Sequence, residues 1–184
     1  HTRFKCDWSS DVCSSDLRIQ TRLSDGLEKL SANEADIITI CGMGGRLIAD
    51  IVTKGMNVIT RNTTLIVSPQ SEVGDFRHFL VSQRLVVDDE KMLKEDGKYY
   101  FIIKCRKSDE NVYSEYSETQ YQYGWKLLES KDKTLYEYLI KEKETNDGIS
   151  NSLKKDESNP TIKLRLQQLL QKNNIIMDAL SYYD

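Results

Sequence analysis

The chain has 184 residues, of which 39% are hydrophobic and 30% are charged, and its formal net charge is −3. This length is enough for one sizeable domain with an appendage. The sequence holds no run of 18 apolar residues and therefore predicts no membrane span. Its acidic balance gives no global signature of nucleic-acid binding, although a local basic patch can act within an acidic protein.

The cysteines and histidines exclude several kinds of site. The four cysteines show neither CxxC spacing nor a paired framework, so we expect reduced thiols and a cytoplasmic protein. They are Cys6, Cys13, Cys41 and Cys105. The two histidines are His1 and His78, so we expect no metal site, and a Ser-His-Asp triad would have to use one of these two.

Residues 1–17, HTRFKCDWSSDVCSSDL, differ in character from the rest of the chain. They have no helical or strand periodicity and lack the apolar core of a signal peptide. They resemble a translated sequencing-adapter read, and we expect a non-native segment; a genuine N-terminal tail is the alternative. Because the chain starts with histidine, we also expect a fragment or a processed product.

From residue 18 onward the pattern alternates between strands and helices. The expected strands are 18–23, 36–41 and 64–67, and the expected helices are 27–30, a segment from the glycines to Gly55, and a segment around 73–80. Two further strands, 84–91 and 98–105, are joined by Lys94-Glu95-Asp96-Gly97, and the Asp-Gly pair favours a tight antiparallel hairpin.

This order of elements predicts an α/β fold, with parallel strands followed by an antiparallel terminal hairpin. Such a sheet is typical of class I methyltransferases. We therefore expect residues 18–110 to form the C-terminal half of a Rossmann-like class I methyltransferase sheet, whose first βαβ half would precede Arg18.

The segment 111–184 has a different pattern, in which charged residues alternate with apolar ones and helix breakers are scarce. Asn146-Asp147-Gly148 is expected to interrupt or kink the first helix, and Asn159-Pro160 supplies a cap and a first-turn proline for the second. The second helix carries one apolar seam, which predicts an α-helical coiled-coil hairpin; a dimerisation or packing element is the alternative. The seam consists of Ile162, Leu166, Leu169, Asn173, Ile176 and Leu180.

The run from Asp36 to Ile51 carries the strongest functional signal. The β-branched residues 37–40 predict a strand buried on both faces, as in a parallel sheet covered by helices. Ligands of such sheets bind at the carboxyl ends of the strands, where Gly42, Gly44 and Gly45 let a ligand approach the backbone. Packing glycines in an ordinary turn are the alternative.

Three motifs offer candidate binding groups. Gly42-Met43-Gly44-Gly45 satisfies neither the dinucleotide fingerprint, since Leu47 takes the place of its third glycine, nor a P-loop. Asp25-Gly26 follows a strand, so its carboxylate can accept hydrogen bonds from a nucleotide, or it is a simple turn. Ser68-Pro69-Gln70 ends the next strand, where Gln70 can read a base edge or merely terminate the strand.

Four segments together resemble the bacterial tRNA adenine(22)-N1 methyltransferases. They are RLSDGLEKL (22–30), ADIITICGMGGRLI (35–48), LIVSPQ (65–70) and KEDGKYYFIIK (94–104). The resemblance runs from about Arg18 to the C-terminus. It implies a Rossmann-like domain with a C-terminal coiled coil, S-adenosylmethionine as methyl donor, and N1 of an adenine in the D-arm region of tRNA as acceptor.

The resemblance also implies roles for individual residues. The implied donor-binding residues are Asp25, Gly26, Cys41, Gly42 and Met43. The implied acceptor-binding residues are Gly44, Gly45, Ser68, Pro69 and Gln70, although some relatives carry asparagine at the last position. Lysines of the helices would help to hold the tRNA, among them Lys126, Lys131, Lys133 and Lys141.

We predict no catalytic base. Adenine N1 already carries a lone pair, so methyl transfer is a direct displacement that depends mainly on positioning the acceptor. The base must leave any stack that it occupies to reach the pocket.

The donor-binding loop of the family, acidic and rich in glycine, would lie upstream of Arg18. We therefore expect the chain alone to bind S-adenosylmethionine weakly or not at all and to be inactive, whereas the intact parent is active. Two alternatives stay open: another S-adenosylmethionine- or nucleotide-dependent α/β enzyme, and a non-catalytic protein whose helical hairpin binds a partner. The sequence predicts no oligomeric state.

Overall fold

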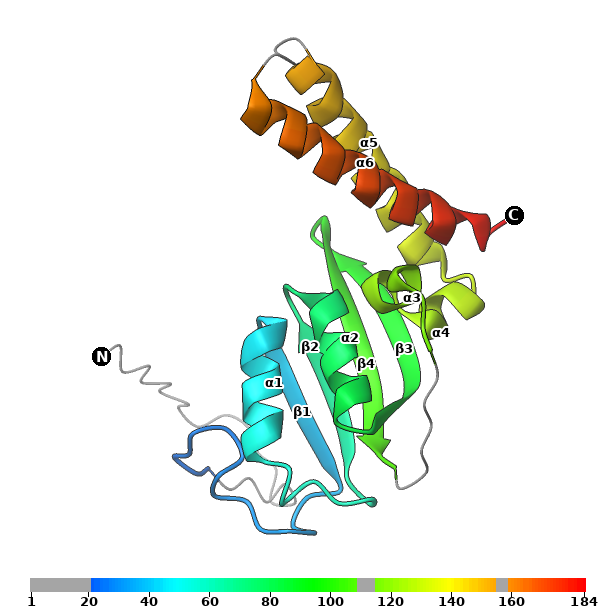
Figure 1. The fold of residues 1–184 in the computed structure, drawn as a ribbon. Coiled ribbons are helices and arrows are strands. Elements are labelled where there is room, and N and C mark those ends of the chain that lie inside the picture. Colours follow the sequence, from blue (N-terminus) through cyan, green and yellow to red (C-terminus); the bar gives the residue numbers. More distant parts are fainter. Residues whose placement is uncertain (1–20, 109–114, 155–158) are drawn as a thin grey trace.

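The computed structural model describes residues 21–108, 115–154 and 159–184. Figure 1 shows a small sheet with helices against it and a long helical hairpin that extends from one end. The expected non-native segment 1–17 and the expected domain boundary at 110/111 lie outside the described residues.

The sheet has four strands in the order β1-β2-β4-β3. Strands β1 (Ile37–Met43) and β2 (Thr64–Pro69) are parallel, whereas β4 (Lys98–Lys107) is antiparallel to both β2 and β3 (Leu85–Glu95). The expected hairpin is confirmed, because residues 96 and 97 have φ of 48° and 75°, as a two-residue hairpin turn requires. The sheet is therefore the mixed, Rossmann-like one that the sequence predicts.

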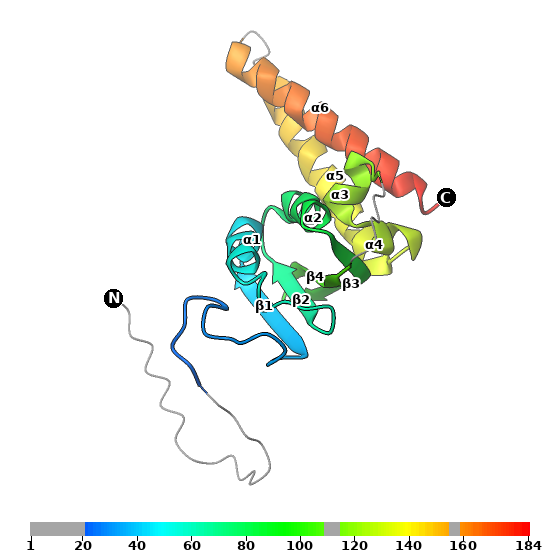
Figure 2. The same cartoon turned by 60° about the horizontal axis from the view of Figure 1, so that its bottom comes forward.

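Helices α1 (Gly45–Lys54) and α2 (Val73–Ser82) lie on the same face of the sheet, as Figures 1 and 2 show. Each presents one apolar side to the strands, and this side is removed from water. The main core cluster includes Ile48, Val52, Leu65, Val67, Phe76, Leu80 and Ile103. Gly55 ends α1, as predicted.

The prediction that β1 is buried on both faces is wrong. Ile38 and Ile40 are 6% and 7% exposed, whereas Ile37 is 60% exposed. This alternation arises because both α1 and α2 cover one face, and the described residues place no helix over the other face of β1. A run of β-branched residues specifies an extended backbone, but it does not specify what covers each face.

Two short elements expected before β1 are not found among the described residues. Residues 18–20 of the expected strand 18–23 lie outside them. Residues 21–23 are not in a strand, and Leu23 is 91% exposed. A strand needs a neighbour for its backbone N–H and C=O groups, and the described residues place none beside this segment. In place of a helix at 27–30 there are single turns, closed by Glu28 N donating to Asp25 O (3.3 Å) and Leu30 N donating to Leu27 O (3.0 Å).

The C-terminal part consists of α3 (Glu118–Tyr123), α4 (Trp125–Glu129), α5 (Lys133–Leu153) and α6 (Pro160–Ser181). Helices α5 and α6 pack side by side, which confirms the expected hairpin. The predicted cap of the last helix is also confirmed, since Asn159 Oδ1 accepts a hydrogen bond from Thr161 N at 2.9 Å.

The expected interruption at residues 146–148 is wrong, because α5 continues through it. Asn146 is buried and donates to Asn173 Oδ1 of α6 at 3.1 Å, so the partner helix satisfies its side chain. A glycine in a helix costs only about 1 kcal/mol, which the packing of the hairpin outweighs. Leu169 and Ile176 flank this asparagine pair as buried apolar layers, and such a polar layer fixes the register of two helices.

A buried ion pair joins the helical part to the sheet. Arg77 Nε of α2 donates to Glu90 Oε1 of β3 at 2.7 Å, and both side chains are 0% exposed. Arg77 Nη1 also donates to the carbonyls of Tyr121 and Gln122 at 2.9 and 3.0 Å, and Glu90 Oε2 accepts from Lys126 N at 3.1 Å. The pair thereby ties α2, β3, α3 and α4 into one unit.

The two described cysteines should differ sharply in reactivity. Cys41 is exposed, whereas burial, aided by Asp88, raises the pKa of Cys105 to about 12. Because the thiolate is the reactive form, we expect iodoacetamide at pH 8 to modify Cys41 in the native chain and Cys105 only in urea. Peptide mapping by mass spectrometry measures both sites, and equal modification of the two in the native chain would contradict this burial.

Candidate functional site

The glycine turn, residues 42–45, lies against the loop formed by residues 68–72. The register between β1 and β2 shifts after Cys41, so that Met43 stands opposite Pro69. Gln70 N then donates to Met43 O, and Gly45 N donates to Ser71 O, both at 2.9 Å. The predicted acceptor-side residues therefore come together at the carboxyl ends of two neighbouring parallel strands.

The glycines of the turn serve different purposes. A Cβ on Gly45 would lie 2.8 Å from Glu72 O and 2.9 Å from Ser71 O, so this position must lack a side chain for α1 to approach the 68–72 loop. Gly42 has φ of 78°, which favours glycine, but a Cβ there would meet nothing within 4 Å. Packing therefore explains Gly45, whereas the backbone at Gly42 stays open to a ligand.

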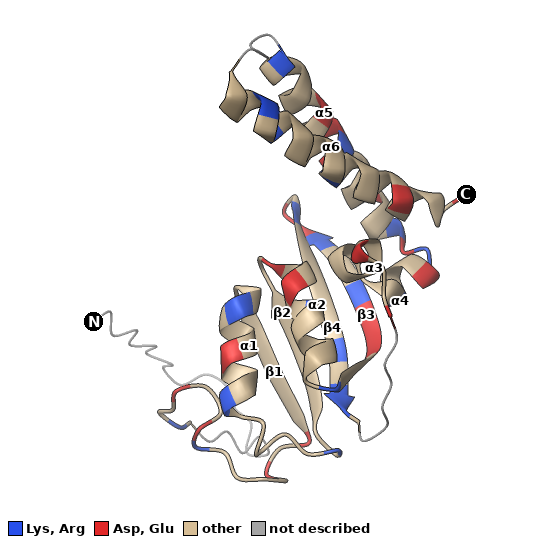
Figure 3. Ribbon diagram, viewed as in Figure 1, with Lys and Arg blue, Asp and Glu red and all other residues tan. Residues whose placement is uncertain are grey.

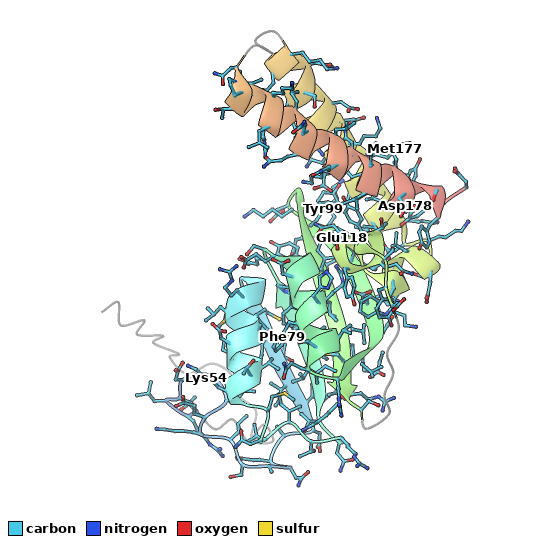
Figure 4. All side chains as sticks on the ribbon, in the orientation of Figure 1. Lys54, Phe79, Tyr99, Glu118, Met177 and Asp178 are labelled. Carbon is cyan, nitrogen blue, oxygen red and sulfur yellow. The ribbon has the colours of Figure 1, made fainter. Side chains whose placement is uncertain are left out.

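Asp25 and Gly26 lie away from the glycine turn. Asp25 Oδ2 is 3.3 Å from Nζ of Lys54, the last residue of α1, and Gly26 packs against Ile51. Figure 4 labels Lys54 at the lower end of α1, whereas the turn precedes the first residue, about 13 Å away along the helix axis. The structure thus brings Cys41–Met43 together with the 68–72 loop but leaves Asp25 and Gly26 at the other end of this helix.

A pocket of about 320 Å³ adjoins the 68–72 loop, and the sequence did not predict it. We call it the aromatic pocket, because Tyr99, Phe101, Tyr123 and Tyr138 contribute four rings to its lining. Figure 4 places Tyr99 at the upper end of the sheet, next to the helical hairpin. Its remaining lining residues are Pro69, Gln70, Ser71, Glu72, Val73, Gly74, Asp75, Gln122, Glu142 and Lys172.

A carboxylate from the helical hairpin is fixed within this pocket. Tyr123 OH donates to Glu142 Oε2 at 2.8 Å, and Lys172 Nζ lies 2.6 Å from Glu142 Oε1. Burial, with a further contribution from Glu142, raises the pKa of Tyr123 and raises that of Tyr138 to about 12. Both hydroxyls therefore keep their protons at neutral pH, and that of Tyr123 donates to the carboxylate.

The lysines that the resemblance assigns to tRNA binding are spread over the helices. Lys126 lies 3.6 Å from Glu129, and Lys131 Nζ donates to Asp184 O at 3.2 Å. Lys141 Nζ lies 5.4 Å from the centroid of the Tyr99 ring, at the edge of the aromatic pocket. Figure 3 shows Lys and Arg interspersed with Asp and Glu along the hairpin, so its positive charges do not form one continuous patch in this view.

Lys133 lines a separate hollow with Tyr136 and Tyr183, near the C-terminus. Within the described ranges there is no group of three or more His, Cys, Asp or Glu side chains that could hold a metal ion. No helix in the same ranges has the length and apolar character to cross a membrane.

Comparison with solved structures supports the fold and the family. The crystal structure of the Bacillus subtilis m1A22 tRNA methyltransferase matches with a TM-score of 0.71 and 28% identity, over 86% of this chain and 69% of that one. The Streptococcus pneumoniae Sp1610 protein, a putative tRNA (m1A22) methyltransferase crystallised with S-adenosyl-L-methionine, matches with a TM-score of 0.71 and 27% identity, over 89% and 69%.

Comparison of sequences supports the same family. The chain is 39% identical over 94 residues to the tRNA (adenine(22)-N(1))-methyltransferase of Bacillus subtilis strain 168, a match that spans 51% of this chain and only 40% of that relative. The model of the family described as tRNA (adenine(22)-N(1))-methyltransferase matches residues 11–177. The chain therefore belongs to the tRNA (adenine(22)-N(1))-methyltransferase family.

Proposed function

We propose that the full-length protein transfers a methyl group from S-adenosylmethionine to N1 of adenine 22 in tRNA. The observation that carries this proposal is the contact between the glycine turn and the 68–72 loop, closed by the hydrogen bonds Gln70 N to Met43 O and Gly45 N to Ser71 O. It forms the ligand-binding end of a Rossmann-like sheet in a chain of this family. Because the curated match spans 40% of the relative, we attribute the activity to the full-length protein.

Residues 41–43 are accessible in the way that contact with the methyl donor requires. Cys41 and Gly42 are exposed, Met43 is 37% exposed, and the Cβ position of Gly42 is open, so the backbone of this segment is accessible to the donor. The donor supplies an electrophilic methyl group on a sulfonium. The placement of Asp25 and Gly26 at the far end of α1 gives no support to their predicted contact with it.

The acceptor side is formed by Gly44, Gly45 and Ser68-Pro69-Gln70. Pro69 is buried and stiffens the loop, whereas Gln70 is exposed and lines the aromatic pocket, where its amide can read a base edge. The chain's task is to hold adenine N1 in line with the methyl group, and this needs no general base. We also propose that the lysines of the hairpin hold the tRNA and that the protein works in the cytoplasm, where its substrates are.

The test is the methylation of tRNA in cells. A Bacillus subtilis strain that lacks its own tRNA (adenine(22)-N(1))-methyltransferase receives the full-length gene that encodes this chain. Because N1-methyladenine blocks base pairing, we expect reverse transcription of tRNA to stop at position 22 only when the gene is expressed. A stop at another position would favour a different methyltransferase, and expressed protein with no stop would favour a non-catalytic role.

A further inference from the structure

The aromatic pocket has the size and lining of a site for one planar group. Its volume of about 320 Å³ lies at the lower end of the range of about 300–1,000 Å³ that is typical of small-molecule sites. Tyr99 and Tyr138 are half-buried and pack edge to face, with ring centroids 5.2 Å apart. Aromatic surfaces of this kind stack unpaired nucleobases.

The pocket is continuous with the predicted acceptor loop. Pro69 and Gln70 line it from the sheet, and Tyr138 and Glu142 line it from α5 of the hairpin. A base that enters beside the 68–72 loop therefore meets residues of the hairpin as well. The hairpin thus forms one wall of this site, in addition to any contact with the rest of the tRNA.

The pocket offers carboxylate oxygens to a positively charged group. Its lining includes the carboxylates of Glu72, Asp75 and Glu142 and the ammonium of Lys172. Further cations lie beside the lining: Arg46 is 3.4 Å from Glu72, and Lys94 and Lys141 lie over the Tyr99 ring at 5.3 and 5.4 Å. It is therefore Glu142, rather than the net charge of the pocket, that favours a cationic ligand. Positively charged bases are rare among the nucleosides of tRNA, and methylation at adenine N1 produces one.

Both oxygens of the Glu142 carboxylate are contacted by donors from other helices. Donors from α3 and α6, Tyr123 and Lys172, contact its two oxygens, and its side chain is 13% exposed. A carboxylate has about four acceptor positions, so it retains capacity for a ligand. The contacts fix its position before the base arrives, which is the condition for electrostatic stabilisation of a developing charge.

The chemistry of the proposed reaction creates such a charge. As adenine N1 bonds to the methyl carbon, the carbon–sulfur bond breaks and its electron pair stays on sulfur. The positive charge therefore moves from the sulfonium to the adenine ring, and no proton has to leave. A carboxylate beside the exocyclic amine binds the cationic product ring more strongly than neutral adenine, and this difference is what accelerates a reaction.

We propose that Glu142 contacts the target adenine in the aromatic pocket and stabilises the positive charge that N1-methylation places on the ring. This proposal rests on the proposed function and adds a substrate-contacting residue that comes from the helical hairpin. Tyr123 acts as a positioning residue for the carboxylate, whereas Lys172 competes with the cationic ring for it.

The proposal is tested by nucleotide binding to the 184-residue chain. Dissociation constants for AMP and for 1-methyl-AMP are measured by NMR titration in the wild type, in Glu142→Gln and in Glu144→Gln, a matched control that is exposed on the same helix. We expect the wild type and the control to favour 1-methyl-AMP by about tenfold, the size of a charged hydrogen bond, and Glu142→Gln to lose this preference.

A second variant gives a prediction of opposite sign. Lys172→Gln removes the ammonium from the pocket and should increase the preference for 1-methyl-AMP, and its side chain is 44% exposed, so the variant should fold. A purely structural role for the Glu142 cluster predicts no such increase. This variant keeps the proposal testable even where Glu142→Gln is unstable.

Three results would overturn the proposal: a wild type that binds neither nucleotide, a preference that survives Glu142→Gln, and a preference that Lys172→Gln leaves unchanged or lowers. Methylation at position 22 together with any of these leaves the proposed function standing and removes only the role of Glu142. If Glu142→Gln loses the preference for 1-methyl-AMP but tRNA is not methylated at position 22, the pocket is still a site for a cationic base and the proposed function is wrong.

Discussion

Glu90→Gln is expected to lower the free energy of unfolding by about 3–5 kcal/mol, the usual cost of breaking a buried ion pair from one side. The loss follows from the environment of Arg77, which is 0% exposed and whose pKa burial lowers. Its Nη2 has no hydrogen-bond partner among the described residues. Glu90, which accepts from Nε, is the group that compensates the charge of Arg77. Urea unfolding followed by circular dichroism measures the change.

The double variant Arg77→Met/Glu90→Leu should recover much of this loss, because two apolar side chains leave no buried charge behind. Glu137→Gln is the matched control, since it breaks an exposed pair with Lys94 (3.1 Å) and should cost less than about 1 kcal/mol. If Glu90→Gln cost no more than Glu137→Gln, the pair would not tie the helical part to the sheet.

Gly45→Ala is expected to destabilise the chain by about 1–3 kcal/mol and to abolish tRNA methylation by the full-length protein. The new Cβ would lie within 2.9 Å of the carbonyl oxygens of Ser71 and Glu72, and backbone atoms cannot move aside as a flexible side chain can. The glycine turn would have to move away from the 68–72 loop. The predicted donor-binding and acceptor-binding residues would then no longer lie together. Thermal unfolding and tRNA methylation measure the two effects.

Gly148→Ala is the matched control, because this glycine also lies in a helix but a Cβ there would meet nothing within 4 Å. Alanine should stabilise α5 by about 0.5–1 kcal/mol and leave methylation unchanged. Equal effects of the two substitutions would show that helix propensity, rather than the close approach at Gly45, governs this position.

The sequence predicted correctly those elements that a few neighbouring residues specify. Asp96-Gly97 fixed the hairpin because its backbone conformation suits few other residues, and Asn159-Pro160 marked the start of α6 by its capping chemistry. The glycines after β1 predicted either access for a ligand or packing in a turn, and the structure shows packing at Gly45, whose N–H donates to Ser71 O.

Features made by distant segments escaped prediction. The aromatic pocket draws on the 69–75 segment, the start of β4, and helices α3, α5 and α6, and no local pattern aligns these. No local pattern marked Arg77 or Glu90 for burial, because packing of α3 and α4 is what buries both. A visible clue was the aromatic run at 99–101 directly after the hairpin turn, with Tyr138 in the following helical segment.

The most direct test of the account is the methylation state of tRNA position 22 in the Bacillus subtilis strain that lacks its own enzyme. We expect a reverse-transcription stop at this position with the full-length wild-type gene and with Gly148→Ala, and none with Gly45→Ala. Stable wild-type protein in cells whose tRNA shows no stop at position 22 would contradict the account.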